Sequence, residues 1–309
     1  MPRLVQLEDC VQVASAESTP CPLDRLVRGL NPGSTWAQAR RVIQTGKVWV
    51  DDRVETDVTS IVRPGQRVEI RMRTPRAHDL PVDSLIYVDR QVIVVRKPPG
   101  ISTVPYDPRD RGTLEQLLER HMARKGARSR SVLVVHRLDK ETSGLLVFAR
   151  TREAQRDLKH QFRLHTVTRQ YVALAEGRVA AATFRSRLVT DRGDGRRGST
   201  SNPRLGREAI THVRPLEFLS GASLLECRLE TGRTHQIRIH LSEAGHPLLG
   251  ERVYSTGDRR PRISAPRLML HARELGFRHP TTQRPLFFEE APPADFTSLV
   301  ESLRHSAGR

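Results

Sequence analysis

The residues best suited to chemistry are concentrated at 136–144, in the segment HRLDKETSG. Apolar runs at 132–135 and 145–149 flank it, so we interpret it as a polar loop between two strands. A turn needs Gly, Asn or Asp at only a few places, whereas this loop carries four charged groups and a histidine. A carboxylate such as Asp139, held ionised in a cleft, can attack an electrophilic carbon or accept a proton. A salt-bridged surface turn is the alternative interpretation.

A second polar segment, LETGRTHQIRIH at 229–240, contains an arginine able to serve the same site. The sequence predicts a helix here that is capped by Thr234 and carries Arg238 beside its apolar face. A guanidinium in that place needs an anion. If Asp139 is that anion, the pair keeps the carboxylate ionised. A buried ion pair with a purely structural role is the alternative.

Short helices and strands precede this segment and form a separate predicted unit. Apolar residues recur at helical spacing over 23–30 and 36–43, and Ser34 is placed to cap the second helix. Short strands are predicted at 48–50 and 68–71. The basic side chains of this unit indicate a surface that contacts phosphates, and a solvated basic face is the alternative. These side chains are Arg25, Arg40, Arg41 and Lys47.

The composition favours a polyanionic partner and excludes an integral membrane protein. Lys plus Arg is 52 and Asp plus Glu is 35, which leaves a net charge of +17. The apolar runs are far shorter than the roughly 20 residues of a bilayer-spanning helix. The first residues lack the pattern of a secretory signal, so we expect a cytoplasmic protein without membrane attachment.

No residues show the spacing of a metal site. The three cysteines are far apart and form no C-x-x-C pair, which fits a reducing cytosol. His235 and His240 are five residues apart, so a helix would turn them about 140° away from each other. We therefore expect no bound metal and interpret these histidines as structural.

Several blocks resemble, in the same order, the RluA family of RNA pseudouridine synthases. They are RKPPG at 96–100, HRLDKETSGLLVFART at 136–151, RQYVALAEG at 169–177 and TGRTHQIRIH at 231–240, with GHPLLGERVY and LHARELGFRHP continuing to residue 280. A nine-residue motif of rare types with ordered companions is far more specific than one short pattern. Upstream, LDRLVRGL, WAQARRVIQTG, KVWVDD and IVRPGQRVEIR resemble the S-four domain, a small RNA-binding module.

The resemblance implies an isomerase that detaches uracil from ribose, rotates it and rejoins it through ring carbon five. Asp139 matches the catalytic aspartate of the family, and Arg238 matches its basic partner. Tyr171 matches the tyrosine that stacks on the target base and assists removal of the carbon-five proton. An aromatic residue in a core strand is the alternative interpretation of Tyr171.

The same resemblance assigns RNA contacts around the aspartate. Arg137 matches a residue that occupies the space left in the RNA when the uridine leaves its stack. His136 and Lys140 are expected to contact RNA or to shape the loop. No cofactor is expected, because the isomerisation is redox-neutral and supplies its own leaving and entering group.

The expected fold class is α+β. Strands outnumber helices and do not alternate with them regularly, which favours a mixed, largely antiparallel sheet. The resemblance makes this a pseudouridine synthase catalytic domain behind a small α/β RNA-binding domain. The predicted order along the chain is a tail at 1–21, the S-four-like domain at 22–72, a linker at 73–84 and the catalytic domain at 85–309.

We expect a monomer whose partner is RNA. Ribosomal RNA is the first expectation for the substrate, and transfer RNA is the alternative. A non-catalytic RNA-binding or ribosome-assembly protein with the same fold is a hypothesis of a different class. A hydrolytic nucleosidase is the weakest, since it needs a second carboxylate to activate water and Glu141 is the only near neighbour in the sequence.

Overall fold

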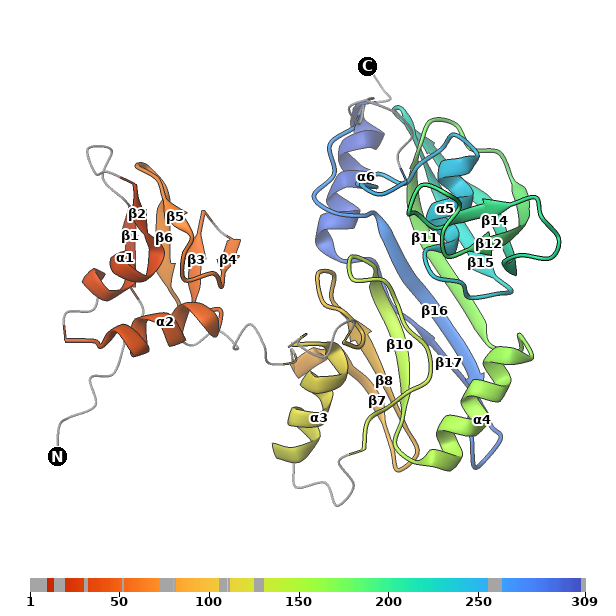
Figure 1. Ribbon diagram of the computed structural model, residues 1–309, viewed down its shortest axis with the longest axis horizontal. Coiled ribbons are helices and arrows are strands. Elements are labelled where there is room, and N and C mark those ends of the chain that lie inside the picture. The colour runs from red at the N-terminus through yellow and green to blue at the C-terminus, as the bar shows by residue number, and fades with distance from the viewer. Residues whose placement is uncertain are drawn as a thin grey trace. The chain divides into compact units, whose positions relative to one another are not determined.

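The chain divides into two compact units, residues 1–81 and 82–309. In the computed structural model the colour runs from red to orange over the first unit and from orange through yellow and green to blue over the second (Figure 1). The residues that the structure describes are 10–13, 20–30, 33–51, 53–72, 80, 82–105, 110, 112–124, 131–254 and 263–306.

The first unit packs two helices, α1 (Leu23–Leu30) and α2 (Trp36–Gln44), against a small antiparallel sheet. Its strands are β1 (Cys10–Val13), β2 (Cys21–Pro22), β3 (Val48–Val50), β4 (Arg53–Glu55), β5 (Ile61–Val62) and β6 (Arg67–Ile70). The sheet has the order β1-β6-β3-β4, and β2 pairs with β5. Buried residues of both helices, such as Val27 and Ile43, meet Val48 and Val68 of the sheet in one core. The helices predicted from the apolar spacing are therefore confirmed.

Two local predictions for this unit are corrected. Residues Cys10–Val13, which fall in the predicted tail at 1–21, pair as β1 with β6, because the open edge of β6 offers unpaired backbone groups to another strand. Helix α2 is capped by Thr35, not by Ser34. The Oγ1 of Thr35 accepts the backbone N–H of Gln38, and the Gln38 side chain accepts the N–H of Thr35, which together form a capping box.

Parts of the predicted tail and linker lie outside the described residues. These parts are 1–9, 14–19, 73–79 and 81. Val82–Ser84, at the end of the predicted linker, form a short 3₁₀ turn (η1).

The second unit is built on one long sheet. Its strands are β7 (Leu85–Val88), β8 (Val92–Lys97), β9 (Leu133–Val134), β10 (Ser143–Ala149), β11 (Thr168–Glu176), β12 (Ala182–Val189), β13 (Gly198–Thr200), β14 (Arg207–Leu219), β15 (Ala222–Leu229), β16 (Leu270–Arg278) and β17 (Pro285–Glu289). The order is β13-β12-β14-β15-β11-β16-β10-β8-β7, with β17 on β16 and β9 on β10. Among the described strands, only β10 and β16 run parallel. The predicted α+β fold with a mixed, largely antiparallel sheet is confirmed.

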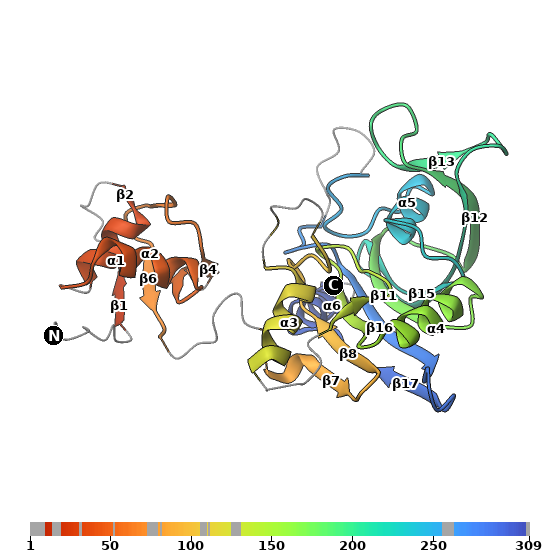
Figure 2. The same cartoon turned by 60° about the horizontal axis from the view of Figure 1, so that its bottom comes forward.

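Four helices accompany this sheet, and none in the described part of the chain is long and apolar enough to cross a membrane. They are α3 (Leu114–Arg124), α4 (Arg152–Arg163), α5 (Gln236–Glu243) and α6 (Ala294–Ser306). Ala154 and Leu158 of α4 pack on Leu145 and Val147 of β10. The strands β12 to β15 curve around α5 in the turned view (Figure 2), and seven consecutive residues of α5 are buried.

One close backbone contact fixes the start of β10, directly after the polar loop. Gly144 has φ +112° and lies opposite Ala272 in the parallel pairing with β16. A Cβ at this position would collide with the Ala272 backbone, so only glycine fits. The polar loop therefore leaves the sheet at a point that the two central strands determine.

Candidate active site

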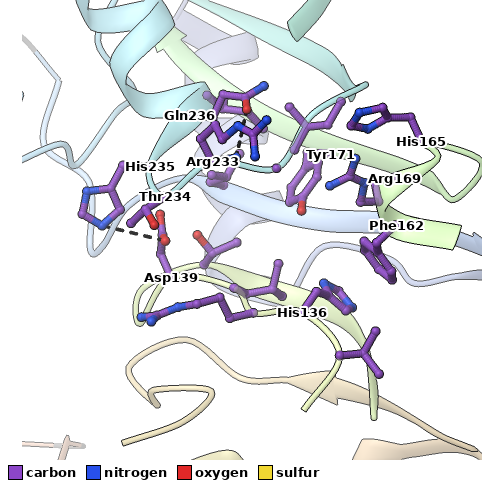
Figure 3. Close-up of a pocket in the computed structure, with 18 of the residues that line it drawn as sticks. His136, Asp139, Phe162, His165, Arg169, Tyr171, Arg233, Thr234, His235 and Gln236 are labelled. Carbon is purple, nitrogen blue, oxygen red and sulfur yellow. Dashed lines mark hydrogen bonds and ion pairs between the residues drawn. The ribbon is translucent and has the colours of Figure 1, made fainter. Parts of the chain in front are cut away.

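A pocket of about 750 Å³ opens in the second unit, between the polar loop, α4, the start of β11 and the segment that enters α5. Asp139, Tyr171 and Arg238 all line it, together with His136 and Arg137. Figure 3 shows Asp139, Tyr171 and His136 around the cavity. The three residues predicted to be catalytic are thus brought into one cavity, although they are distant in the sequence.

Hydrogen bonds to the backbone of the loop hold it on both sides of Asp139. The Oγ1 of Thr103 donates to the carbonyl of Leu138 over 2.9 Å and accepts the Leu138 N–H over 3.1 Å. The N–H of Thr142 donates to the carbonyl of Asp139 over 3.1 Å. The carboxylate is thereby carried on a fixed backbone, and its side chain is 18% exposed.

A buried lysine forms the floor beneath this loop. The Nζ of Lys97 donates to the carbonyls of Pro98, Ile101 and Lys140, each over 2.9 Å, and the residue is fully buried. Burial lowers the pKa of Lys97 to about 7, although the charges of Glu141 and Asp139 oppose the shift. Sequence reasoning matched Lys97 only as a letter of the RKPPG block and gave it no role.

Arg238 has a closer partner than the predicted one. Its Nε and Nη2 donate to the carboxylate of Glu251 over 2.7 and 2.8 Å, whereas its Nη1 lies 3.6 Å from Oδ2 of Asp139. Glu251 is 1% exposed and also accepts the backbone N–H of Val253 and Tyr254. Burial would raise the pKa of Glu251, but the hydrogen bonds from Arg238 lower it. Glu251 is thus an ionised anchor for Arg238, which sequence reasoning missed.

His235 lies on the other side of Asp139 and was also missed. Its Nε2 is 3.8 Å from Oδ1 of Asp139, and its Nδ1 is 2.6 Å from the hydroxyl of Tyr254. His235 is the N-cap of α5 with φ +59°, and its side chain makes no capping hydrogen bond. The predicted cap, Thr234, is therefore wrong: the chain enters α5 through a left-handed residue that turns the imidazole toward the carboxylate (Figure 3).

Tyr171 lies in β11 with its ring in the pocket, next to Phe162 and Arg169 (Figure 3). It is 8% exposed, and burial raises its pKa to about 12, so the phenol stays protonated at neutral pH. The Arg169 guanidinium lies 5.3 Å from the centre of the Phe162 ring and donates to the carbonyl of Glu230 over 2.6 Å. Aromatic rings and guanidinium planes are the surfaces on which unstacked bases pack.

Of the other polar residues of the loop, His136 forms part of the pocket wall, whereas Arg137 and Lys140 are exposed. The Nε2 of His136 accepts the N–H of Val147, and its ring stacks on Phe162 with 4.5 Å between centres. Burial lowers the pKa of His136 to about 3, so it forms a neutral wall of the pocket. Arg137 is exposed at the pocket, and Lys140 is exposed outside its lining.

Helix α4 adds a basic face at the pocket. Arg156, Lys159 and Arg163 are exposed, line the pocket and follow one side of the helix. Arg156 lies 3.5 Å from Glu153, while no carboxylate in the described part of the chain is within ion-pair distance of the other two. Some arginines elsewhere in this unit form ion pairs with carboxylates: Arg96, Arg185, Arg214, Arg267, Arg273 and Arg304. The pocket therefore keeps positive charge that the protein does not neutralise.

In the first unit, the four predicted phosphate contacts lie on or near the two helices. Arg25, Arg40 and Arg41 are exposed and Lys47 is half-buried. Arg40 also forms an ion pair with Asp24 over 2.9 Å. Their role in binding RNA stays a prediction. Within the described residues, no cluster of three or more His, Cys, Asp or Glu has the arrangement of a metal site.

Comparison with known proteins gives two family matches. The sequence profile of the RNA pseudouridylate synthase family matches residues 91–243, and that of the S4 domain matches residues 21–68. A Bacillus subtilis protein named as an uncharacterized RNA pseudouridine synthase is 34% identical, over 94% of this chain and 97% of its own length. The ribosomal large subunit pseudouridine synthase D of Zymomonas mobilis is 37% identical, over 76% of this chain and 78% of its own length.

Solved structures agree on the fold. Human RNA Pseudouridylate Synthase Domain Containing 4 matches with a TM-score of 0.60 at 23% identity, over 72% of this chain and 93% of that chain. Human RNA Pseudouridylate Synthase Domain Containing 1 matches with a TM-score of 0.56 at 25% identity, over 71% of this chain and 86% of that chain. The protein therefore belongs to the RluA family of RNA pseudouridine synthases, isomerases that act on RNA, and it has an S4 domain ahead of its synthase domain.

Proposed function

We propose that the protein converts a uridine of ribosomal RNA to pseudouridine in this pocket, with Asp139 as the reacting group and without a cofactor. One observation carries the proposal. The Asp139 carboxylate lies in the cavity with Arg238 3.6 Å from one oxygen and His235 3.8 Å from the other. A negative charge held in this way can act on the ribose of a uridine that has left its stack.

The reaction balances without an outside reactant. The bond between ring nitrogen one and the anomeric carbon breaks, the base turns, and the anomeric carbon bonds to ring carbon five. Carbon five releases its proton to solvent, and nitrogen one gains one. The ionised Asp139 either attacks the anomeric carbon or removes a proton from the ribose, and both routes use an anion at this position.

Tyr171 and Arg137 have separate tasks in this proposal. The ring of Tyr171 stacks on the extruded uracil, and its hydroxyl assists loss of the carbon-five proton. Arg137, exposed at the pocket, fills the space that the uridine leaves. Extrusion costs a few kcal/mol, which stacking and phosphate contacts must offset. The basic face of α4 is suited to supply such contacts.

The choice of ribosomal RNA rests on the relatives. Those named ribosomal large subunit pseudouridine synthase D are 32–39% identical to this chain. The S4 domain supports an RNA substrate of any class, so transfer RNA is the alternative. A non-catalytic RNA-binding protein would have no need to keep Asp139, Tyr171 and Arg238 in one pocket. A nucleosidase would need a free second carboxylate, and Glu251 is engaged by Arg238.

Transcripts labelled with tritium at uracil carbon five test the proposal. Wild type is expected to release tritium to water from labelled ribosomal RNA and to release none from labelled transfer RNA. Asp139→Asn is expected to bind the same transcript without releasing label. Glu301→Gln, an exposed change on α6, serves as the control and keeps the wild-type rate.

Three results would contradict parts of this proposal. If Asp139→Asn releases tritium at the wild-type rate, the aspartate is not the reacting group. If wild type releases tritium from transfer RNA alone, the substrate is transfer RNA and not ribosomal RNA. Free uracil as the product makes the enzyme a hydrolase.

A further inference from the structure

We infer that His235 is a positioning residue for Asp139 and that Tyr254 fixes which nitrogen of its ring carries the proton. The inference rests on the proposed role of Asp139. It goes beyond that role because it assigns a partner, His235, to the second oxygen of the carboxylate. It also assigns a task to the hydroxyl of Tyr254, which acts on Asp139 only through His235.

The two oxygens of Asp139 face different groups. Oδ2 lies 3.6 Å from Nη1 of Arg238, and Oδ1 lies 3.8 Å from Nε2 of His235. Both distances exceed a formed hydrogen bond, and catalytic contacts in the absence of substrate are often long and shorten when it binds. When both contacts shorten on substrate binding, the two partners fix the plane of the carboxylate and with it the direction from which it meets the ribose.

Tyr254 determines the state of the His235 ring. Its hydroxyl lies 2.6 Å from Nδ1. Tyr254 is 6% exposed, and burial raises the pKa of its phenol, which therefore keeps its proton and donates it. A neutral imidazole that accepts at Nδ1 carries its own hydrogen at Nε2. That hydrogen points at Asp139.

The surroundings keep the imidazole neutral. Burial lowers the pKa of His235, and the charges of Arg238 and Arg197 act in the same direction, whereas Asp139 and Glu251 favour the protonated ring. A neutral N–H can orient the carboxylate and leave its full charge available for reaction. An imidazolium would instead pair with Asp139 and reduce its reactivity.

The backbone of His235 supports a functional role. A left-handed conformation is unfavourable for a non-glycine residue, and here φ is +59°. The side chain does not compensate for this unfavourable conformation, because it makes no capping hydrogen bond to the helix. The neighbouring Gln236 accepts the N–H of Arg233 and donates to Ile210 and Thr211, which holds the turn in place. The strained turn directs the imidazole at Asp139, as is common at functional sites.

The variant His235→Asn separates this role from packing. Asparagine tolerates the left-handed backbone, but the variant also removes the partner of the buried Tyr254 hydroxyl, so we expect it to melt close to the wild-type temperature. With the imidazole gone, we expect kcat for tritium release to fall about 10- to 100-fold, while the KM for RNA changes less than about twofold. A kcat within twofold of wild type would overturn the inference.

Tyr254→Phe tests the proton assignment while it keeps the ring that packs on His235. Without the hydroxyl, Nδ1 is free to take a proton, so the pKa of His235 rises. The acid limb of the plot of kcat against pH should therefore move to higher pH. Relative to wild type, kcat of the variant should fall more at pH 6 than at pH 8. Tyr87→Phe, which removes a hydroxyl bonded to Asp89 outside the pocket, is the control and keeps the wild-type profile.

The outcomes distinguish this inference from the proposed function. If Asp139→Asn is active, the role of the aspartate fails and His235 has nothing to position. If Asp139→Asn is inactive while a Tyr254→Phe profile superimposes on that of wild type, the proton assignment alone is wrong.

Discussion

Arg238 is the residue on which two carboxylates converge. Glu251 holds its Nε and Nη2, which leaves Nη1 for Asp139 at a longer distance. An arginine without this anchor would be free to pair closely with Asp139 and neutralise it. In the proposed reaction, Glu251 therefore keeps Arg238 near enough to stabilise the charge of Asp139 and far enough to leave the carboxylate reactive.

Glu251→Gln should damage both stability and catalysis. Removing one charge of a buried ion pair costs roughly 3–5 kcal/mol, and we expect the free energy of unfolding to fall by about that amount. We also expect kcat to fall more than the affinity for RNA. Glu217→Gln is the matched control, because its partner Arg304 is half exposed and such pairs contribute roughly 1 kcal/mol or less.

Denaturation in urea followed by circular dichroism measures these changes. Both tryptophans, Trp36 and Trp49, lie in the first unit, so their fluorescence would not report on the second. Equal losses of stability for the two variants would contradict the role given to Glu251.

The sequence identified the residues that lie within recognisable motifs. Asp139, Tyr171 and Arg238 were found in this way. His235 was inside a motif, but it was interpreted as structural, because its left-handed backbone cannot be read from residue type. Glu251 follows Arg238 by 13 positions with no helical or strand spacing between them, so only the fold reveals their contact.

At the scale of elements, α4 is the helix whose position at the pocket matters most for RNA. Its buried side packs on β10, and its exposed side presents Arg156, Lys159 and Arg163 at the cavity. No helix was predicted over these residues from the sequence. Only the fold brings the basic face of α4 to the same pocket as Asp139.

The triple variant Arg156→Gln, Lys159→Gln, Arg163→Gln should weaken RNA binding without altering the chemical step. Each phosphate contact on a single strand contributes about 0.7 to the slope of log affinity against log salt, so we expect the slope to fall by about 2. The single-turnover rate at saturating RNA should stay at the wild-type value. Arg304→Gln on α6 is the control, and an unchanged slope in the triple variant would refute the contact.

The sheet shows why local patterns predicted the fold class but not its details. The apolar run at 145–149 predicted β10 correctly because this strand is buried along its whole length. The parallel pairing of β10 with β16 joins residues more than 120 positions apart, which no local pattern encodes. The strand at Cys10–Val13 likewise depends on a partner far along the chain.

At the scale of the whole molecule, buried histidines make the second unit sensitive to acid. Burial lowers the pKa of His271 and His240 to about 4 and that of His136 to about 3. The unfolded chain takes up protons near pH 6.5, before the folded state does, so stability is lost as pH falls from 6.5 toward 4. For His271, which is 1% exposed, the shift corresponds to about 3 kcal/mol.

His271→Gln should flatten this dependence. The loss of unfolding free energy between pH 7.5 and pH 5, measured by urea denaturation, is expected to be smaller in the variant than in wild type. His305→Gln, an exposed change on α6, should leave the dependence unaltered. Identical pH dependence in all three proteins would show that His271 does not titrate as its burial implies.

The buried amino group of Lys97 makes it possible to measure local opening of this enzyme. Amine-selective acylating reagents reach exposed lysines at once, but they can modify Lys97 only when the surrounding chain lifts away from its three carbonyl acceptors. The rate at which an acyl adduct appears at this position, detected by mass spectrometry, would thus report the rate at which the segment that carries Asp139 opens. Bound transcript should lower the rate of acylation.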